Sequence, residues 1–125
     1  MKNLKVMVLF SLLVLSTGVL FSQTKSKINP EGTWAFTAPE APYEYSTGDF
    51  VITLDGKELK GELVFSEYYK VPVQDLKLEN DSLTFRAYVE GTLIYSKNKI
   101  TNDEIKGAVS SSEGIIQFTA KRKQE

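Results

Sequence analysis

The sequence contains no cysteine and no histidine. Without cysteine there is no disulfide, no thiol nucleophile and no thiolate metal ligand. Without histidine the chain lacks the commonest general base and the commonest transition-metal ligand. A serine–histidine triad, a papain-like protease and a zinc hydrolase are therefore excluded. Because no G-x-S-x-G motif occurs either, we expect no enzyme activity, no cofactor and no metal site. Paired carboxylates or calcium remain the alternative.

Concentrated positive charge is also missing. The chain has 15 Lys+Arg and 16 Asp+Glu. Without Lys2 and Lys5 of the leader described below, 13 basic residues remain against 16 acidic ones, a net charge of −3. The only basic cluster is the terminal run 121–123. Since nucleic-acid binding requires a strongly basic face, we expect no nucleic-acid partner.

The first residues are typical of an export signal. Lys2 and Lys5 precede an apolar run that extends from Val6 to Phe21, and the small residue Ser22 follows. The sequence predicts a signal peptide over residues 1–22, a flexible lead-in over 23–30, one domain over 31–122 and a tail over 123–125. We expect an exported protein, periplasmic or extracellular, with no stable membrane span after cleavage. An uncleaved anchor is the alternative, although the run is short for the ~20 residues of a spanning helix.

The rest of the chain alternates apolar and polar residues with period two, as half-buried strands do. Turn signals such as Asp55-Gly56, Asn80-Asp81 and Asn102-Asp103 separate the runs. A bulge near Gln74-Asp75 would reconcile the two parities within residues 71–78. In residues 92–100 the inner face stays ambiguous between Leu93/Tyr95 and Ile94/Ile100. The pattern predicts an all-β fold, an antiparallel up-and-down barrel of eight strands, with a β-sandwich as the alternative. The expected strands are 32–37, 49–54, 59–65, 71–78, 83–89, 92–100, 105–109 and 116–120.

Alternate connections of such a barrel lie at opposite ends. The three tight turns share one end, and the longer loops share the other, including the proline-containing loop 38–48. That end carries four of the six tyrosines: Tyr43, Tyr45, Tyr68 and Tyr69. Tyrosine is favoured at recognition surfaces, so we predict a ligand-binding rim there. The alternative is that these rings cap the core, in a lumen filled by its own large side chains.

With the strands placed, Gly32-Thr33-Trp34 in the first strand and a late basic residue, Lys121 or Arg122, resemble the lipocalin/calycin superfamily. The layout from Gly32 to Arg122 is similar to small lipocalin-like β domains of exported bacterial proteins. The resemblance implies that Trp34 closes the narrow end of the barrel and that Lys121 or Arg122 packs over it. The chain lacks the helix of true lipocalins, and no biotin-site residues are carried over from the avidin branch.

We therefore expect a small exported barrel that binds an apolar small molecule or a protein partner of the cell envelope at its long-loop rim. The alternative is a packed structural or interaction module of the envelope with no ligand cavity.

Overall fold

The computed structural model of the protein describes residues 28–124, which form one antiparallel sheet of nine strands. The expected signal peptide, residues 1–22, lies outside the described residues, as do 23–27 of the lead-in and Glu125 of the tail. A short 3-10 helix, η2 (Tyr43–Tyr45), lies between the first two strands. The strands are β1 (Gly32–Thr37), β2 (Thr47–Asp55), β3 (Glu58–Ser66), β4 (Tyr69–Pro72), β5 (Gln74–Glu79), β6 (Ser82–Val89), β7 (Thr92–Ile100), β8 (Glu104–Ser111) and β9 (Gly114–Arg122).

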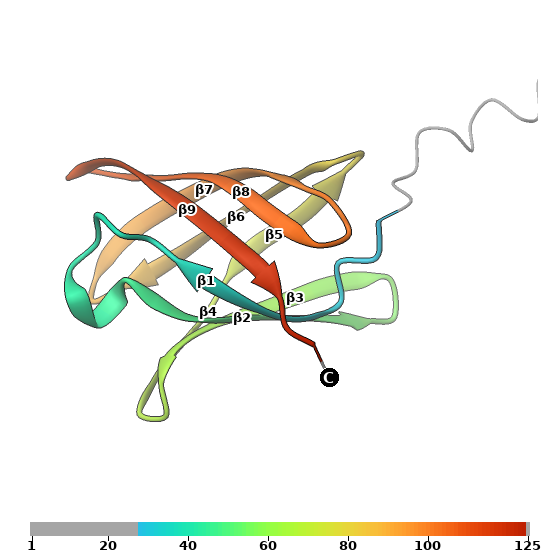
Figure 1. Cartoon of the computed structure of the whole chain (residues 1–125), viewed down its shortest axis with the longest axis horizontal. Coiled ribbons are helices and arrows are strands. Elements are labelled where there is room, and N and C mark those ends of the chain that lie inside the picture. Colours follow the sequence, from blue (N-terminus) through green and yellow to red (C-terminus); the bar gives the residue numbers. More distant parts are fainter. Residues whose placement is uncertain (1–27, 125) are drawn as a thin grey trace, which may run out of the picture.

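The sheet curls into a nearly closed up-and-down barrel (Figure 1). Neighbours in the chain pair with each other, except for β4 and β5, and the first strand also pairs with the last. This pairing sets Trp34 opposite Arg122 and Phe36 opposite Ala120. Because one continuous sheet forms the wall, the sandwich alternative, which needs two sheets, is not what the chain adopts.

The sheet has nine strands where the sequence predicts eight, and the difference lies within residues 71–78. The predicted bulge is confirmed, because the pairing of β5 with β6 shifts register between Gln74 and Lys77. Asp75 has φ of 54°, a left-handed conformation that interrupts an extended strand. The break in the expected strand falls at Val73, before Asp75, and separates β4, which pairs with β3, from β5, which pairs with β6. One seam of the barrel is therefore left unsealed.

The kinked strand passes closest to β3 at Gly61. The Val73 amide donates a hydrogen bond to the Gly61 carbonyl oxygen over 3.0 Å. A Cβ on Gly61 would lie 2.8 Å from Val73 Cγ2 and 3.1 Å from Leu76 Cδ2. The missing side chain of Gly61 thus allows the segment around Val73 to approach β3. This narrows the seam, although β4 and β5 form no backbone pairing across it.

The two ends of the barrel differ as the loop pattern predicts. The connections β2–β3, β5–β6 and β7–β8 are tight and lie at one end, on the right in Figure 1. The N-terminal end of the described part packs at that end too: Ile28 contacts the core and Pro30 is buried. The long connection between β1 and β2 lies at the other end, with the β6–β7 and β8–β9 turns. The tip of the β3–β4 hairpin projects from the barrel on this side (Figure 1).

The core fills the barrel from its middle to the tight-turn end. Alternate residues of each strand point inward, and the largest fully buried ones are Trp34, Phe50, Ile52, Leu83, Phe85, Ile100 and Ile105. In β7 the structure selects one of the two predicted faces: Ile100 is buried, Ile94 is partly buried, and Leu93 and Tyr95 are exposed. The sequence was ambiguous here because two polar residues share the inner face with the isoleucines.

These two polar residues, Ser96 and Asn98, are buried between β6 and β8. The Asn98 amide nitrogen donates to Ser96 Oγ over 2.8 Å and to the Leu83 carbonyl oxygen over 3.2 Å. Ser96 Oγ in turn donates to the Ala108 carbonyl oxygen over 3.2 Å. Gly107 leaves the space that Asn98 occupies, since a Cβ there would lie 2.5 Å from Asn98 Oδ1. These bonds satisfy the Asn98 amide nitrogen and the Ser96 hydroxyl, whereas Asn98 Oδ1 is buried without a hydrogen-bond partner among the described residues.

Candidate functional site

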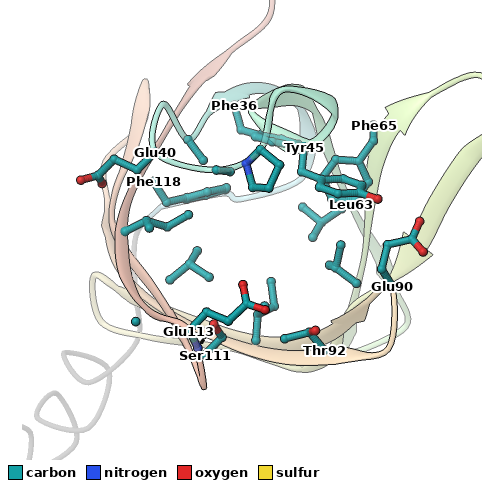
Figure 2. Close-up of a pocket in the computed structure, with 18 of the residues that line it drawn as sticks. Phe36, Glu40, Tyr45, Leu63, Phe65, Glu90, Thr92, Ser111, Glu113 and Phe118 are labelled. Atoms are coloured by element: carbon teal, nitrogen blue, oxygen red, sulfur yellow. Dashed lines mark hydrogen bonds between the residues drawn. The ribbon is translucent and has the colours of Figure 1, made fainter.

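A cavity of about 460 Å³ opens at the long-loop end of the barrel (Figure 2). Its volume falls within the range of about 300–1,000 Å³ that is common for small-molecule sites. The floor consists of the phenylalanine rings that top the core, Phe36, Phe85 and Phe118. Phe36 and Phe118 stack with their centroids 5.5 Å apart, and Phe85 meets Phe118 edge-on at 6.1 Å. The cavity is therefore a space above a packed aromatic layer.

Aliphatic side chains from strands far apart in the chain form the walls. The inward positions of β3, β6, β7, β8 and β9 next above the core supply them, namely Leu63, Val89, Ile94, Val109 and Ile116. Each of them is buried or partly buried. Because inward positions alternate along a strand, the same period that builds the core also makes this upper ring apolar.

The connection between β1 and β2 covers part of the opening and supplies Ala38, Ala41 and Pro42 to the lining. Its backbone is hydrogen-bonded to itself: the Ala38 amide donates to the Ser46 carbonyl oxygen over 2.7 Å, and the Ala41 amide to the Ala38 carbonyl oxygen over 3.0 Å. Glu40 Oε1 accepts a hydrogen bond from the Gln117 amide over 2.8 Å. The loop is thus held to β9 beyond the point where β1 stops pairing with it.

Tyr45 stands at the mouth of the cavity, in a cluster with Phe65 and Tyr69. Its ring meets Phe65 edge-on at 5.3 Å, and Phe65 stacks on Tyr69 at 5.6 Å. The Tyr69 hydroxyl oxygen accepts a hydrogen bond from the Glu90 amide over 2.9 Å. Since Tyr69 belongs to β4 and Glu90 follows β6, this bond spans the unsealed seam at its open end.

The Glu90 side chain interacts with the same cluster. The interaction of its carboxylate with the Tyr45 hydroxyl, together with desolvation and the negative charges of Glu90 and Glu44, raises the pKa of Tyr45 from the ordinary 10.0 to about 12. Glu90 has φ of 51°, and Gly91 follows with φ of 81°. This tight β6–β7 turn therefore places Glu90 in a conformation that is uncommon for a residue with a side chain.

The four tyrosines predicted for the rim do not converge on one site. Tyr45 lines the cavity and also a second hollow of about 470 Å³ on the outer side of the Tyr45–Phe65 pair. Tyr69 and Tyr43 line that outer hollow only, and Tyr43 is 91% exposed. Tyr68 lines neither hollow and is 89% exposed at the tip of the β3–β4 hairpin. The structure brings Tyr45 and Tyr69 together and leaves the other two apart.

The residues predicted for the closed end meet there, apart from Lys121. Trp34 is fully buried, and its indole nitrogen donates to the Pro30 carbonyl oxygen over 3.0 Å. The Arg122 guanidinium lies over the Trp34 ring, 4.2 Å from its centroid, whereas Lys121 is exposed. Gly32 has φ of 142°, and a Cβ there would lie 3.0 Å from Arg122 Nη1. Glycine at this position therefore leaves room for the guanidinium.

Sequence reasoning missed two carboxylates of the lining, Glu90 and Glu113, and did not predict that Glu40 lines the same cavity. They lie in connections at the long-loop end, as the tyrosines do. The alternation of loops between the two ends could therefore have predicted their location. Figure 2 shows the Glu113 carboxylate directed over the opening, while those of Glu40 and Glu90 lie at its outer edge. Within residues 28–124, no three acidic side chains come close enough together to hold a metal ion.

Comparisons with protein families, with curated proteins and with solved structures found no match to this chain. In the part of the chain that the structure describes, no helix has the length and hydropathy needed to cross a membrane. The function must therefore be argued from the geometry.

Proposed function

We propose that this protein is an exported lipocalin-like barrel that binds an apolar small molecule in the cavity at its long-loop end. The observation that carries the proposal is the cavity itself, open at one end, floored by phenylalanine rings and walled by aliphatic side chains. Small-molecule sites are concave and mostly apolar, with a few polar groups at defined places. The polar groups here are confined to the mouth, where Tyr45 and the glutamates lie.

The closed end supports the lipocalin-like part of the proposal. Arg122 packs over Trp34, as the resemblance implies for a late basic residue. The long β1–β2 connection at the opposite end agrees with it as well. The barrel differs from the expected one at β4 and β5, which do not pair with each other. The closed end and the cavity support the proposal, and this seam does not bear on it.

Titration with the neutral dye phenylnaphthylamine, whose emission increases in apolar surroundings, tests the proposal. We expect saturable binding to one site with a Kd of about 1–100 μM, given about 0.3–0.5 kcal/mol for each non-hydrogen atom of such a ligand. Ile116→Trp fills the cavity from its wall and should abolish binding. Ile115→Trp is the matched control, because Ile115 is next in the chain but 71% exposed on the outer face.

Equal dye binding by both variants would contradict the proposal, provided that both are folded by circular dichroism. So would the absence of any binding to the unmodified protein.

A second candidate is a packed envelope module that contacts a protein partner through its rim. The observation favouring it is the high exposure of Tyr43 and Tyr68, which do not line the cavity. The dye titration separates the two candidates, since Tyr43→Ala and Tyr68→Ala should leave dye binding unchanged if the cavity is the site. If the dye does not bind at all, the packed module becomes the better proposal.

A further inference from the structure

The charge at the mouth of the cavity has one sign. Three glutamates and no lysine or arginine are among the residues of 28–124 that line it. The same holds for the adjoining outer hollow, whose charged lining residues are Glu44 and Glu90. The ion pairs formed within residues 28–124 use other carboxylates, those of Asp49, Asp55, Asp75 and Asp81. The described part of the chain therefore leaves the charge at the mouth without a counter-ion.

The three lining carboxylates are held in different ways. Glu40 is bound to the Gln117 amide and turned to the outer edge (Figure 2). The Glu90 carboxylate interacts with the Tyr45 hydroxyl and lies at the outer edge of the opening (Figure 2). The Glu113 amide donates to Ser111 Oγ over 3.0 Å, which fixes the β8–β9 turn, and the Glu113 carboxylate extends over the opening. Glu113 is thus the charge that lies over the opening, and Glu90 adds a second negative charge at its edge.

We propose that the ligand is a cationic amphiphile, with an apolar body in the cavity and an ammonium or similar cation at the mouth beside Glu113 and Glu90. The inference rests on the proposed function and adds the charge class of the ligand. A carboxylate head group, as in a fatty acid, would meet like charges and no basic side chain of the described lining. A cation would meet the Glu113 carboxylate over the opening, the negative charge of Glu90 at its edge, and the aromatic rings of Tyr45 and Phe65, which also attract cations.

Three probes of equal chain length, decylamine, decanol and decanoate, test the inference by calorimetry at pH 7 and low salt. The amine is protonated at this pH, since alkyl ammonium groups have pKa values near those of lysine, about 10.4. Partly exposed charge pairs are worth little individually, so we expect the amine to bind about tenfold more tightly than decanoate, with decanol between them. Added salt should reduce this ratio by screening the carboxylates.

The double variant Glu90→Gln/Glu113→Gln removes both charges and retains an acceptor for the Tyr45 hydroxyl. It should lower the amine-to-decanoate ratio to below about threefold while leaving decanol affinity unchanged. The matched control is Glu58→Gln, which removes an exposed charge at the tight-turn end and should preserve the ratio.

The outcomes separate this inference from the proposed function. Equal affinities for the three probes, or tighter binding of decanoate, would overturn the cationic ligand and leave the apolar cavity intact as a site. An unchanged ratio in the double variant would also overturn it. Failure of all three probes to bind would overturn the proposed function together with the inference.

Discussion

Replacing Arg122 with alanine should destabilise the barrel more than replacing either neighbouring basic residue, Lys121 or Lys123. The guanidinium covers the Trp34 ring at 4.2 Å from its centroid. It also ties together three segments that meet at the closed end. Nε donates to the Asn102 carbonyl oxygen over 2.8 Å, Nη1 to that of Glu31 over 2.9 Å and Nη2 to that of Asn29 over 2.8 Å.

The magnitude follows from these contacts. A cation over an aromatic ring contributes about 0.5–2 kcal/mol, and a hydrogen bond to a charged group about 1.5–3 kcal/mol when buried. The carbonyl bonds of Arg122 lie at a partly exposed site, and ordering an arginine side chain costs about 2 kcal/mol. The contributions are not additive, so we expect Arg122→Ala to lower the free energy of unfolding by about 2–4 kcal/mol. With a urea m-value of about 1.2 kcal/mol/M for a domain of this size, the midpoint should fall by about 1.7–3.3 M.

The assay is urea unfolding followed by the fluorescence of Trp34, the only tryptophan of the chain. Circular dichroism should give the same midpoint, which guards against a purely local change around the indole. Lys121→Ala is the matched control, since Lys121 is adjacent and exposed, and it should shift stability by less than about 0.5 kcal/mol. Arg122→Lys keeps the charge but not the planar fork, so it should recover only part of the loss. If Arg122→Ala were as stable as Lys121→Ala, the reasoning about the closed end would be refuted.

Three further changes probe other parts of the barrel. Trp34→Ala empties a fully buried site and should cost about 3–5 kcal/mol in thermal or urea unfolding, so a stable, soluble variant would contradict the role of Trp34 in the core. Gly107→Ala places a Cβ 2.6 Å from Asn98 Cα, a backbone atom that cannot give way, and should cost about 1–3 kcal/mol or more, whereas unchanged stability would refute the contact. The pKa of Tyr45 is about 12 in the folded barrel, against the ordinary 10.0 expected in the unfolded chain, so the folded state holds the phenol proton more tightly. The resulting contribution to stability is complete below pH 10 and is lost as the pH rises toward 12. The tyrosinate absorbance of the protein minus that of Tyr45→Phe should therefore titrate near pH 12, and a difference curve centred at pH 10 would rule out the bond to Glu90.

Much of the barrel could be predicted because period-two alternation and turn residues act locally. They located the strands, the bulge near Gln74-Asp75 and the asymmetry of the two ends. They could not show that the expected strand divides at Val73, because that depends on its two halves pairing with different strands, β3 and β6, and on the space above Gly61. The inner face of β7 was ambiguous for a similar reason: Asn98 is tolerated inside only because Gly107 of the neighbouring strand leaves room for it.

The candidate site was predicted less completely. Loop parity identified the open end, and composition drew attention to its tyrosines, yet only Tyr45 of the four lines the cavity. Exposed glutamates are common on any surface, so nothing in the sequence distinguished Glu90 and Glu113 from the others. Glu90 lies in the β6–β7 turn and Glu113 in the β8–β9 turn, and both turns lie at the mouth of the cavity. Which turns face each other depends on the pairing of strands that are distant in the sequence.

The two ends of the barrel are held by different numbers of hydrogen bonds, and this difference indicates where the proposed ligand would enter. At the closed end Arg122 binds the carbonyl groups of the lead-in and of the β7–β8 turn, so opening it would break several hydrogen bonds together. At the open end the cavity is limited by a loop held through Glu40 and by a seam bridged by the Tyr69–Glu90 hydrogen bond. Two hydrogen bonds hold this end against three at Arg122, so we expect the proposed ligand to enter here. Glu90 takes part in both places, since its backbone amide bridges the seam and its carboxylate lies at the edge of the mouth, so the proposed head group would bind next to the seam.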